Sequence, residues 1–313
     1  MATYVFQRLV VSFPVLLGVL LIGFLLLQVV PSDPVELLAG PEATDEVRDS
    51  IRRELGLDRP LHEQFFSYLA RVAQGDLGRS LISNRSVAEE LWLAIPPTAE
   101  LAGVALLWAI PAGLGLGTLA AIRRGSLVDR CVMALSVTGL SVPVFFLGLM
   151  LIRYVGFEWQ LLPFVGRPGP IYTLDGLLAI VLPAATLGGI LVGPIARMTR
   201  TTTLEVLRAD YVRTARAKGV AELRVVLAHV LRTALIPIVT LIGLQAAFLL
   251  GGAVVTETLF AWPGLGLLAV GAILSRDFPL AQGAIMILAL AFIVINLAVD
   301  LLYTRLDPRV RRR

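Results

Sequence analysis

The chain is poor in the residues from which most metal and redox sites are built. It contains one cysteine, Cys131, one lysine, Lys218, and two histidines, His62 and His229, among 313 residues. A single cysteine excludes an internal disulfide and a cysteine-built metal site. The two histidines lie far apart in the sequence, whereas a zinc site needs three or four clustered ligands. We therefore expect no metal in this chain.

Catalytic motifs are lacking as well. A phosphate-binding P-loop, G-x-x-x-x-G-K-[ST], needs Ser or Thr after its lysine, and the sole lysine, Lys218, is followed by Gly219. Neither a G-x-S-x-G nucleophile turn nor an H-E-x-x-H zinc motif occurs. We expect no catalytic residue, no ATP bound through a P-loop and no cofactor in this chain, which excludes an enzyme acting alone.

Charge is scarce, and apolar residues take its place. Charged residues make up 16% of the chain, apolar residues make up 57%, and the mean hydropathy is +0.82. These values are typical of an integral membrane protein. The net charge of +4 does not indicate a nucleic-acid partner, because the arginines lie at the ends of apolar runs. The predicted fold is an all-α polytopic membrane protein in a lipid bilayer.

Six apolar runs are long enough to span a bilayer at roughly 20 residues each. A cleaved signal peptide is the alternative interpretation of the first run. The run is too long for a signal peptide and lacks a small-x-small cleavage site, so we predict an uncleaved span. The apolar segment 264–274 is too short to span, so we predict a re-entrant or surface helix there. The six predicted transmembrane helices are 9–30, 98–122, 131–155, 176–198, 234–255 and 281–302.

Basic residues set the predicted orientation. With six spans and an internal N-terminus, 17 of the 27 basic residues fall on the inner side, including the five arginines of 305–313. A seventh span at 264–274 would move those arginines outside, against the positive-inside rule. Both termini are therefore predicted to be cytoplasmic.

The segment 31–97 is the long polar stretch of the chain and is predicted to lie outside. Its part 42–56 has helical spacing, with Val47, Ile51 and Leu55 on one side. A solvated linker is one interpretation. The length of the segment and its aromatic cluster at 65–68 favour a small packed layer instead.

The inner segment 199–233 has the pattern of a docking element. Thr202 and Glu205 match a capping box and predict a helix start. Gly219 suits the left-handed position that ends a helix. A second amphipathic helix is predicted from apolar residues at three- and four-residue spacing, namely Leu223, Val226, Leu227, Val230 and Leu231.

Two stretches of the chain resemble those of a known family. The sequence DYVRTARAKG (210–219), followed by ALIP (234–237), is similar to the EAA loop of ATP-binding-cassette (ABC) importer permeases of the dipeptide, oligopeptide and nickel subfamily. Arg213 stands where the name-giving Glu would be. The sequence ETLFAWPGLG (257–266), with SRDFP (275–279), resembles a hallmark of the same subfamily, and so does the Pro-x-Asp-Pro of 31–34. Together these stretches extend the resemblance over essentially the whole chain.

The resemblance implies the fold and the partners. It implies a type I ABC importer transmembrane domain over 1–313, with an extracytoplasmic loop at 31–97 and a cytoplasmic coupling loop at 199–233. A homologous second permease, two ATPase subunits that hold ATP and Mg, and an extracytoplasmic substrate-binding protein would be the partners, in a bacterial or archaeal cell membrane. Peptides are the expected cargo. The ATPase-coupling residues are expected to be Asp210, Tyr211, Arg213, Thr214, Ala215, Arg216, Ala217, Lys218 and Gly219.

Candidates for the transport pathway lie at the fifth predicted span and just after it. Gln245, between Gly243 and Gly251, either lines the pathway or bonds a neighbouring helix, since intramembrane polar side chains do both. Glu257 lies at the outer end of the fifth predicted span, where a solvated side chain is expected. It is a pathway candidate because it belongs to the hallmark stretch that also contains Trp262, Pro263 and Gly264. The alternative function is an ATP-independent carrier or channel, which predicts midplane charge pairs and inverted repeats. The sequence shows neither.

Overall fold

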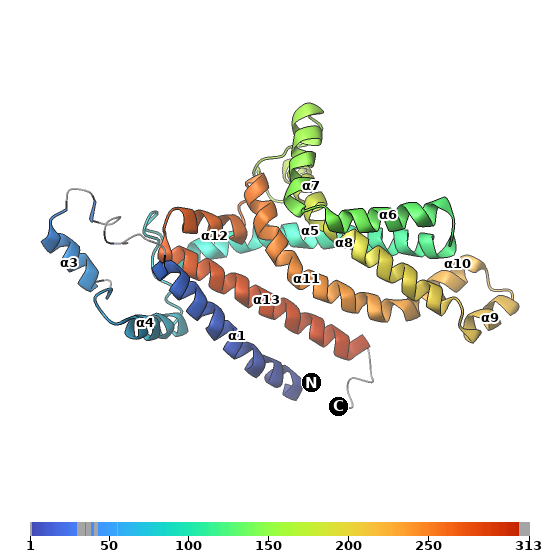
Figure 1. Ribbon diagram of the computed structural model, residues 1–313, viewed down its shortest axis with the longest axis horizontal. Helices are drawn as coiled ribbons and strands as arrows, with labels where there is room; N and C mark the ends of the chain where they lie inside the picture. Colours follow the sequence, from blue (N-terminus) through green and yellow to red (C-terminus); the bar gives the residue numbers. More distant parts are fainter. Residues whose placement is uncertain (1, 30–34, 36–38, 41–42, 55, 307–313) are drawn as a thin grey trace. The chain divides into compact units, whose positions relative to one another are not determined.

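The computed structural model describes every residue except 1, 30–34, 36–38, 41–42, 55 and 307–313. Helices form nearly all of its regular structure, and the β structure in the described ranges is one isolated bridge between Arg79 and Ser86 (Figure 1). The chain divides into two compact units, 1–98 with 263–293 and 99–262 with 294–313. The predicted Pro-x-Asp-Pro motif and Leu55 lie outside the described residues.

In the ranges that the structure describes, the first unit contains four whole helices and parts of two others. These are α1 (Ala2–Val29), α3 (Asp45–Glu54), α4 (Leu61–Ala73), the start of α5 (Val87–Ile122), α12 (Leu265–Leu274) and the first half of α13 (Phe278–Leu306). The ten-residue α12 confirms the short helix predicted at 264–274. Its first turn is held by the Leu265 N–H, which donates to Thr98 Oγ1 at 2.8 Å.

Part of the polar segment packs, as the aromatic cluster predicted. The Phe65 ring centroid lies 5.4 Å from that of Phe24 on α1, and the Tyr68 ring stacks on Phe24 at 6.3 Å. Tyr68 is buried with Leu20 and Met286, so α4 rests on α1 and α13. No residue of α3 whose side chain is described is buried, so the packed layer is formed by α4.

The second unit is built around α8 (Leu174–Val206). Its other elements are the rest of α5, α6 (Leu127–Ser141), α7 (Val144–Leu151), π-helix η1 (Ile152–Glu158), α9 (Asp210–Ala217), α10 (Glu222–Arg224), π-helix η2 (Val225–Leu231), α11 (Arg232–Phe260) and the end of α13. Helices α6, α7 and α11 pack against α8, and Figure 1 shows α8 running beside α11. The core contains Leu101, Leu187, Ile238 and Trp262, all fully buried.

Glycines allow close contacts between helices of the second unit. A Cβ on Gly113 would lie 2.6 Å from Cγ2 of Ile195, and one on Gly117 would overlap the Ala196 carbonyl, so α5 and α8 pack backbone to backbone there. Gly243 likewise allows the side chain of Val299 on α13 to approach α11 closely. Among the described residues, no atom lies within 4 Å of a Cβ built on Gly115 or Gly251.

Length and composition allow up to six spans in the described part of the chain. Three single helices, α5, α8 and α13, are long and apolar enough to cross a membrane, and three bent helix pairs pass the same test when each is taken as one span. The number equals the predicted six, but the set differs, because α11 contributes to two of the pairs. This count includes α12 within a pair and leaves out α1, whose described apolar part, Val10–Leu25, is shorter.

The predicted span 131–155 is not one straight helix. It is divided between α6 and α7 with η1, which meet at a bend of 106°. Val142 has ψ 119°, an extended conformation, because the ring of Pro143 disfavours helical backbone in the preceding residue. Pro143 can be read from the sequence, but the size of the bend cannot.

Candidate functional site

The helix start predicted at Thr202 is wrong. Thr202 and Glu205 lie inside the last turns of α8, which continues to Val206, beyond the predicted end of its span at Met198. The Thr202 hydroxyl donates to the Met198 carbonyl at 2.9 Å instead of capping a new helix. A threonine in a continuous helix bonds backwards to the carbonyl four residues earlier. The new helix is α9, which begins at Asp210 after Ala209.

The helix stop predicted at Gly219 is confirmed. Helix α9 ends at Ala217, Lys218 follows as its cap, and Gly219 has φ +77°. The Gly219 N–H donates to the Arg216 carbonyl at 2.9 Å, which closes the turn. Within the part of the chain that the structure describes, no atom lies within 4 Å of the position of a Cβ on Gly219. Glycine is therefore needed for the backbone conformation and not for lack of space.

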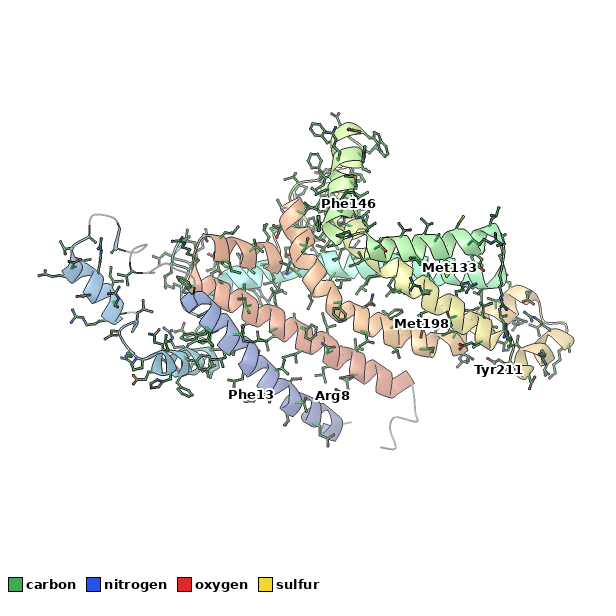
Figure 2. The ribbon with its side chains drawn as sticks, in the orientation of Figure 1. Arg8, Phe13, Met133, Phe146, Met198 and Tyr211 are labelled. Carbon is green, nitrogen blue, oxygen red and sulfur yellow. The ribbon has the colours of Figure 1, made fainter. Side chains whose placement is uncertain are left out.

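Helix α9 has one buried face and one exposed face. Val212 is fully buried against Val225 and Val230 of η2, and Ala215 packs against the same cluster. The Tyr211 hydroxyl donates to Thr233 Oγ1 at 3.1 Å, which ties α9 to the start of α11; Figure 2 labels Tyr211 in this region. The exposed face carries polar and small residues, namely Asp210, Arg213, Thr214, Arg216, Ala217 and Lys218.

The second helix of the segment buries only part of the predicted apolar face, namely Val226 and Val230. Val225, Val226 and Val230 are buried, whereas Leu223 and Leu227 are 72% and 54% exposed. The segment 225–231 is a π-helix, whose wider turn shifts side chains away from the three- and four-residue spacing of an α-helix. Two leucines are thereby left on the outside of the segment.

An ion pair that the sequence analysis did not anticipate spans the glycine turn. Arg216 donates to the Glu222 carboxylate through Nη2 at 2.6 Å and Nε at 3.0 Å. This hydrogen bonding lowers the pKa of Glu222, so the carboxylate stays charged at neutral pH. Both side chains are about half exposed, so the pair contributes at most about 1 kcal/mol. It links the end of α9 to the start of α10 across Gly219.

The stretch SRDFP (275–279) meets the segment 75–81 in the first unit, although the two lie far apart in the sequence. Asp277, 1% exposed, accepts the Leu81 N–H at 3.1 Å and the Ser80 hydroxyl, and it also accepts the Leu280 N–H at 3.3 Å in the first turn of α13. One buried carboxyl group thus joins the segment 75–81 to the beginning of α13.

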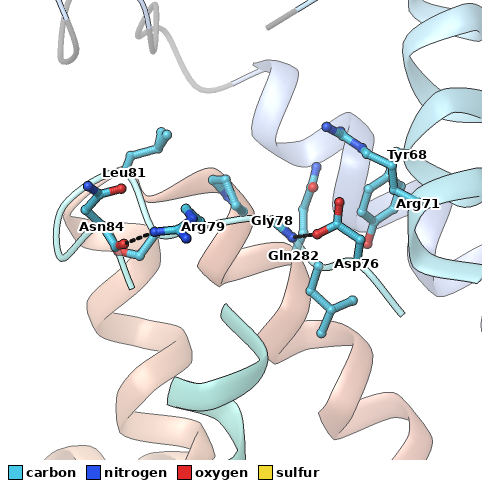
Figure 3. A pocket seen from close by; sticks show the side chains of 11 residues that line it. Tyr68, Arg71, Asp76, Gly78, Arg79, Leu81, Asn84 and Gln282 are labelled. Carbon is cyan, nitrogen blue, oxygen red and sulfur yellow. Dashed lines mark hydrogen bonds between the residues drawn. The ribbon is translucent and has the colours of Figure 1, made fainter. Parts of the chain in front are cut away.

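A cavity of about 500 Å³ lies beside this junction (Figure 3). Asp76 accepts the Gly78 N–H at 2.9 Å, and Arg79 donates to the Asn84 carbonyl at 3.2 Å. Burial raises the pKa of Tyr68 to about 12, so its hydroxyl stays neutral. The polar side chains that line the cavity are Tyr68, Arg71, Asp76, Arg79, Ser80, Asn84 and Gln282.

The pathway candidates occupy different environments. Gln245 is half-buried on α11. Glu257 is fully buried, so the expected solvation is wrong, and Trp262 belongs to the core of the same unit, with its backbone N–H donating to the Glu257 carbonyl at 2.8 Å. Pro263 is exposed and Gly264 is buried at the start of α12, in the other unit.

Glu100, at the outer end of the second predicted span, is not simply solvated either. Arg167 donates to both of its carboxylate oxygens at 2.9 Å.

Comparisons with known proteins agree with the resemblance. The family described as "Binding-protein-dependent transport system inner membrane component" matches residues 113–312, and its N-terminal companion family matches residues 1–102. The glutathione transport system permease protein GsiC of Salmonella choleraesuis (strain SC-B67) is 44% identical over 311 residues, covering 99% of both chains. GsiC of Escherichia coli (strain K12) has the same identity and coverage.

A solved structure has the same fold. The inward-facing MetNI methionine ABC transporter matches with a TM-score of 0.57 and 20% identity, over 69% of this chain and 96% of that one. At this identity the likeness concerns the fold alone. Taken with the two family matches, which together cover most of the sequence, it leads to one conclusion: this chain belongs to the inner-membrane components of binding-protein-dependent transport systems, the permease subunits of ABC importers.

Proposed function

We propose that this chain forms half of the translocation pathway of an ATP-driven importer of peptide-like substrates, and that α9 is where an ATPase subunit docks. The observation that carries the proposal is the two-sided character of α9. Its polar, small-residue face is exposed, while Val212 fixes the other face to the rest of the unit. A short helix held in this way can enter a groove on a partner without unfolding.

Contacts on the buried side of α9 connect it to the long apolar helices α8 and α11. Helix α9 packs on η2, η2 continues into α11, and η2 also contacts α8. A partner that displaces α9 therefore moves the inner ends of two long apolar helices together. Closure of the ATPase subunits on ATP would move this group as a rigid body and change access to the pathway. Gln245, on α11, remains a candidate for lining that pathway, with Glu257, Trp262, Pro263 and Gly264.

The partners and the cargo follow from the family. A homologous second permease supplies the other half of the pathway, two ATPase subunits hold ATP and Mg, and an extracytoplasmic binding protein delivers the substrate. The GsiC relatives are named for glutathione transport, so we propose a peptide-like cargo that includes glutathione. This chain carries no cofactor of its own and hydrolyses nothing by itself.

The proposed location is a bacterial or archaeal cell membrane, with both termini in the cytoplasm. Thr44 and Ala221 are both exposed and lie on opposite sides in this orientation. In a Cys131→Ser background, a cysteine at Thr44 should react in intact cells with an impermeant thiol reagent, and one at Ala221 should react only after lysis. Labelling of Ala221 in intact cells would contradict the orientation.

Transport by the reconstituted complex tests the function. Proteoliposomes that contain this chain with its partner subunits should accumulate glutathione or a dipeptide only when ATP and the binding protein are present. Vanadate, which traps ABC ATPases, should stop uptake. Uptake that persists without ATP would support the ATP-independent carrier or channel instead.

A further inference from the structure

A basic cavity of about 400 Å³ lies where the inner end of α8 meets the turn between α5 and α6. The turn contributes Arg124, and α8 with its C-terminal cap region contributes the rest. The cavity is lined by Arg124, Arg200, Thr201, Leu204, Glu205 and Arg208. None of these residues belongs to α9 or to the proposed pathway.

One wall of the cavity is fixed by a buried ion pair. Arg200 donates through Nη2 to Oδ2 of Asp129 at 2.8 Å and through Nε to the other carboxylate oxygen. Asp129 is 4% exposed and also accepts the Gly125 N–H at 2.9 Å. The turn that carries Arg124 is thereby attached to α8, which fixes one wall of the cavity.

The other two arginines are available to an anion. Arg124 and Arg208 are exposed, and neither forms an ion pair with any residue that the structure describes. The charge of Arg200 is neutralised by Asp129. Among the lining residues this leaves two guanidinium groups, those of Arg124 and Arg208, and one carboxylate, that of Glu205. Each guanidinium offers a planar fork of donors that matches phosphate oxygens.

Exposed apolar side chains flank the turn that carries Arg124. Ile122 and Leu127, on either side of the turn, are 50% and 77% exposed, and Leu204 lines the cavity itself. A phosphate joined to hydrocarbon chains would satisfy both parts of this surface. Basic pockets at the cytoplasmic ends of membrane helices are sites where anionic lipid headgroups bind.

We propose that this cavity binds the phosphate headgroup of an anionic phospholipid, with the acyl chains against Ile122 and Leu127. The inference rests on the membrane location of the chain and on its proposed orientation, and it does not depend on coupling through α9. A free phosphate ion shares the headgroup chemistry, but it would make no use of the exposed apolar side chains.

The test is lipid retention by the purified complex in native mass spectrometry. The probes are phosphatidylglycerol and phosphatidylcholine, added in equal amounts. The wild type should retain phosphatidylglycerol preferentially, and Arg124→Ala/Arg208→Ala should lower its apparent affinity roughly 30-fold, from the usual contribution per basic residue near an anionic lipid. The matched control is Arg123→Ala/Arg130→Ala, which removes the same charge from exposed positions in and beside the same turn, neither of them in the lining.

Three outcomes would overturn the proposal. Equal retention of the two lipids by the wild type would remove the site. An equal loss in the control variant would show that general positive charge attracts the lipid and that the cavity has no part in it. Displacement of the lipid by millimolar inorganic phosphate would identify a free anion as the ligand. Co-purification of the ATPase subunits with both variants shows that they are folded and keeps this result separate from the docking proposal.

Discussion

The replacement of Gly219 by valine is the sharpest test of the coupling segment. At φ +77° a β-branched residue is strained by about 1–3 kcal/mol. Because no atom lies within 4 Å of the Cβ position, this strain is conformational and not steric. It corresponds to a roughly 5- to 150-fold loss in the population of the native turn. The Arg216–Glu222 pair, worth at most about 1 kcal/mol, cannot offset the upper part of that range.

Gly219→Asn is the matched control. Asparagine tolerates the left-handed region far better than valine and places a side chain of similar size in the same open space. We expect Gly219→Val to lose most ATPase subunits during purification and most ATP-dependent transport, and Gly219→Asn to keep both. Wild-type retention and transport in Gly219→Val would refute the role of the turn. Equal losses in the two variants would show that any side chain there blocks docking, so the backbone conformation would not be the cause.

Three further predictions follow from residues with contrasting environments. Ala217→Trp, on the exposed face of α9, should reduce ATPase retention without lowering the unfolding temperature of the complex. Ala215→Trp should instead overpack the Val212 cluster and cost about 1–3 kcal/mol of stability. The opposite pattern would show that the buried and exposed faces of α9 are assigned the wrong way round. Gln245→Leu should lower transport and leave assembly intact, and normal uptake would remove Gln245 from the pathway. Asp277→Ala should destabilise the complex by about 3 kcal/mol in thermal unfolding, because buried donors lose their acceptor, and no shift would contradict its bridging role.

Features set by one residue and its immediate neighbours were predictable from the sequence. Gly219 ends α9 because few other residues adopt its backbone conformation. The break at Pro143 was not predicted, because proline alone does not decide it: Pro183 and Pro194 lie inside the continuous helix α8. The capping box at Thr202 failed because the same residues also fit the interior of a helix, and only the continuation of α8 decides between the two. The π-helix at 225–231 was hidden for a similar reason, since its valines also match an α-helical period.

Contacts between distant parts of the chain were beyond prediction. The sequence analysis identified 275–279 as part of a hallmark, but nothing in that stretch predicts that Asp277 accepts a hydrogen bond from Ser80. Glu257 was expected to be solvated because it lies near the end of an apolar run. It is buried because the chain that follows α11 places Trp262 in the core of the same unit. The basic cavity likewise requires Arg124 and Arg208 to come together from two separate elements.

Site-directed photo-crosslinking tests the central claim most directly. A photoreactive amino acid at Ala217, on the exposed face of α9, is compared with one at Thr44, exposed in the polar segment of the other unit. The account predicts that Ala217 captures an ATPase subunit in the assembled complex and that Thr44 captures none. Absence of the ATPase from the Ala217 products, with the complex intact by mass, would contradict docking at α9.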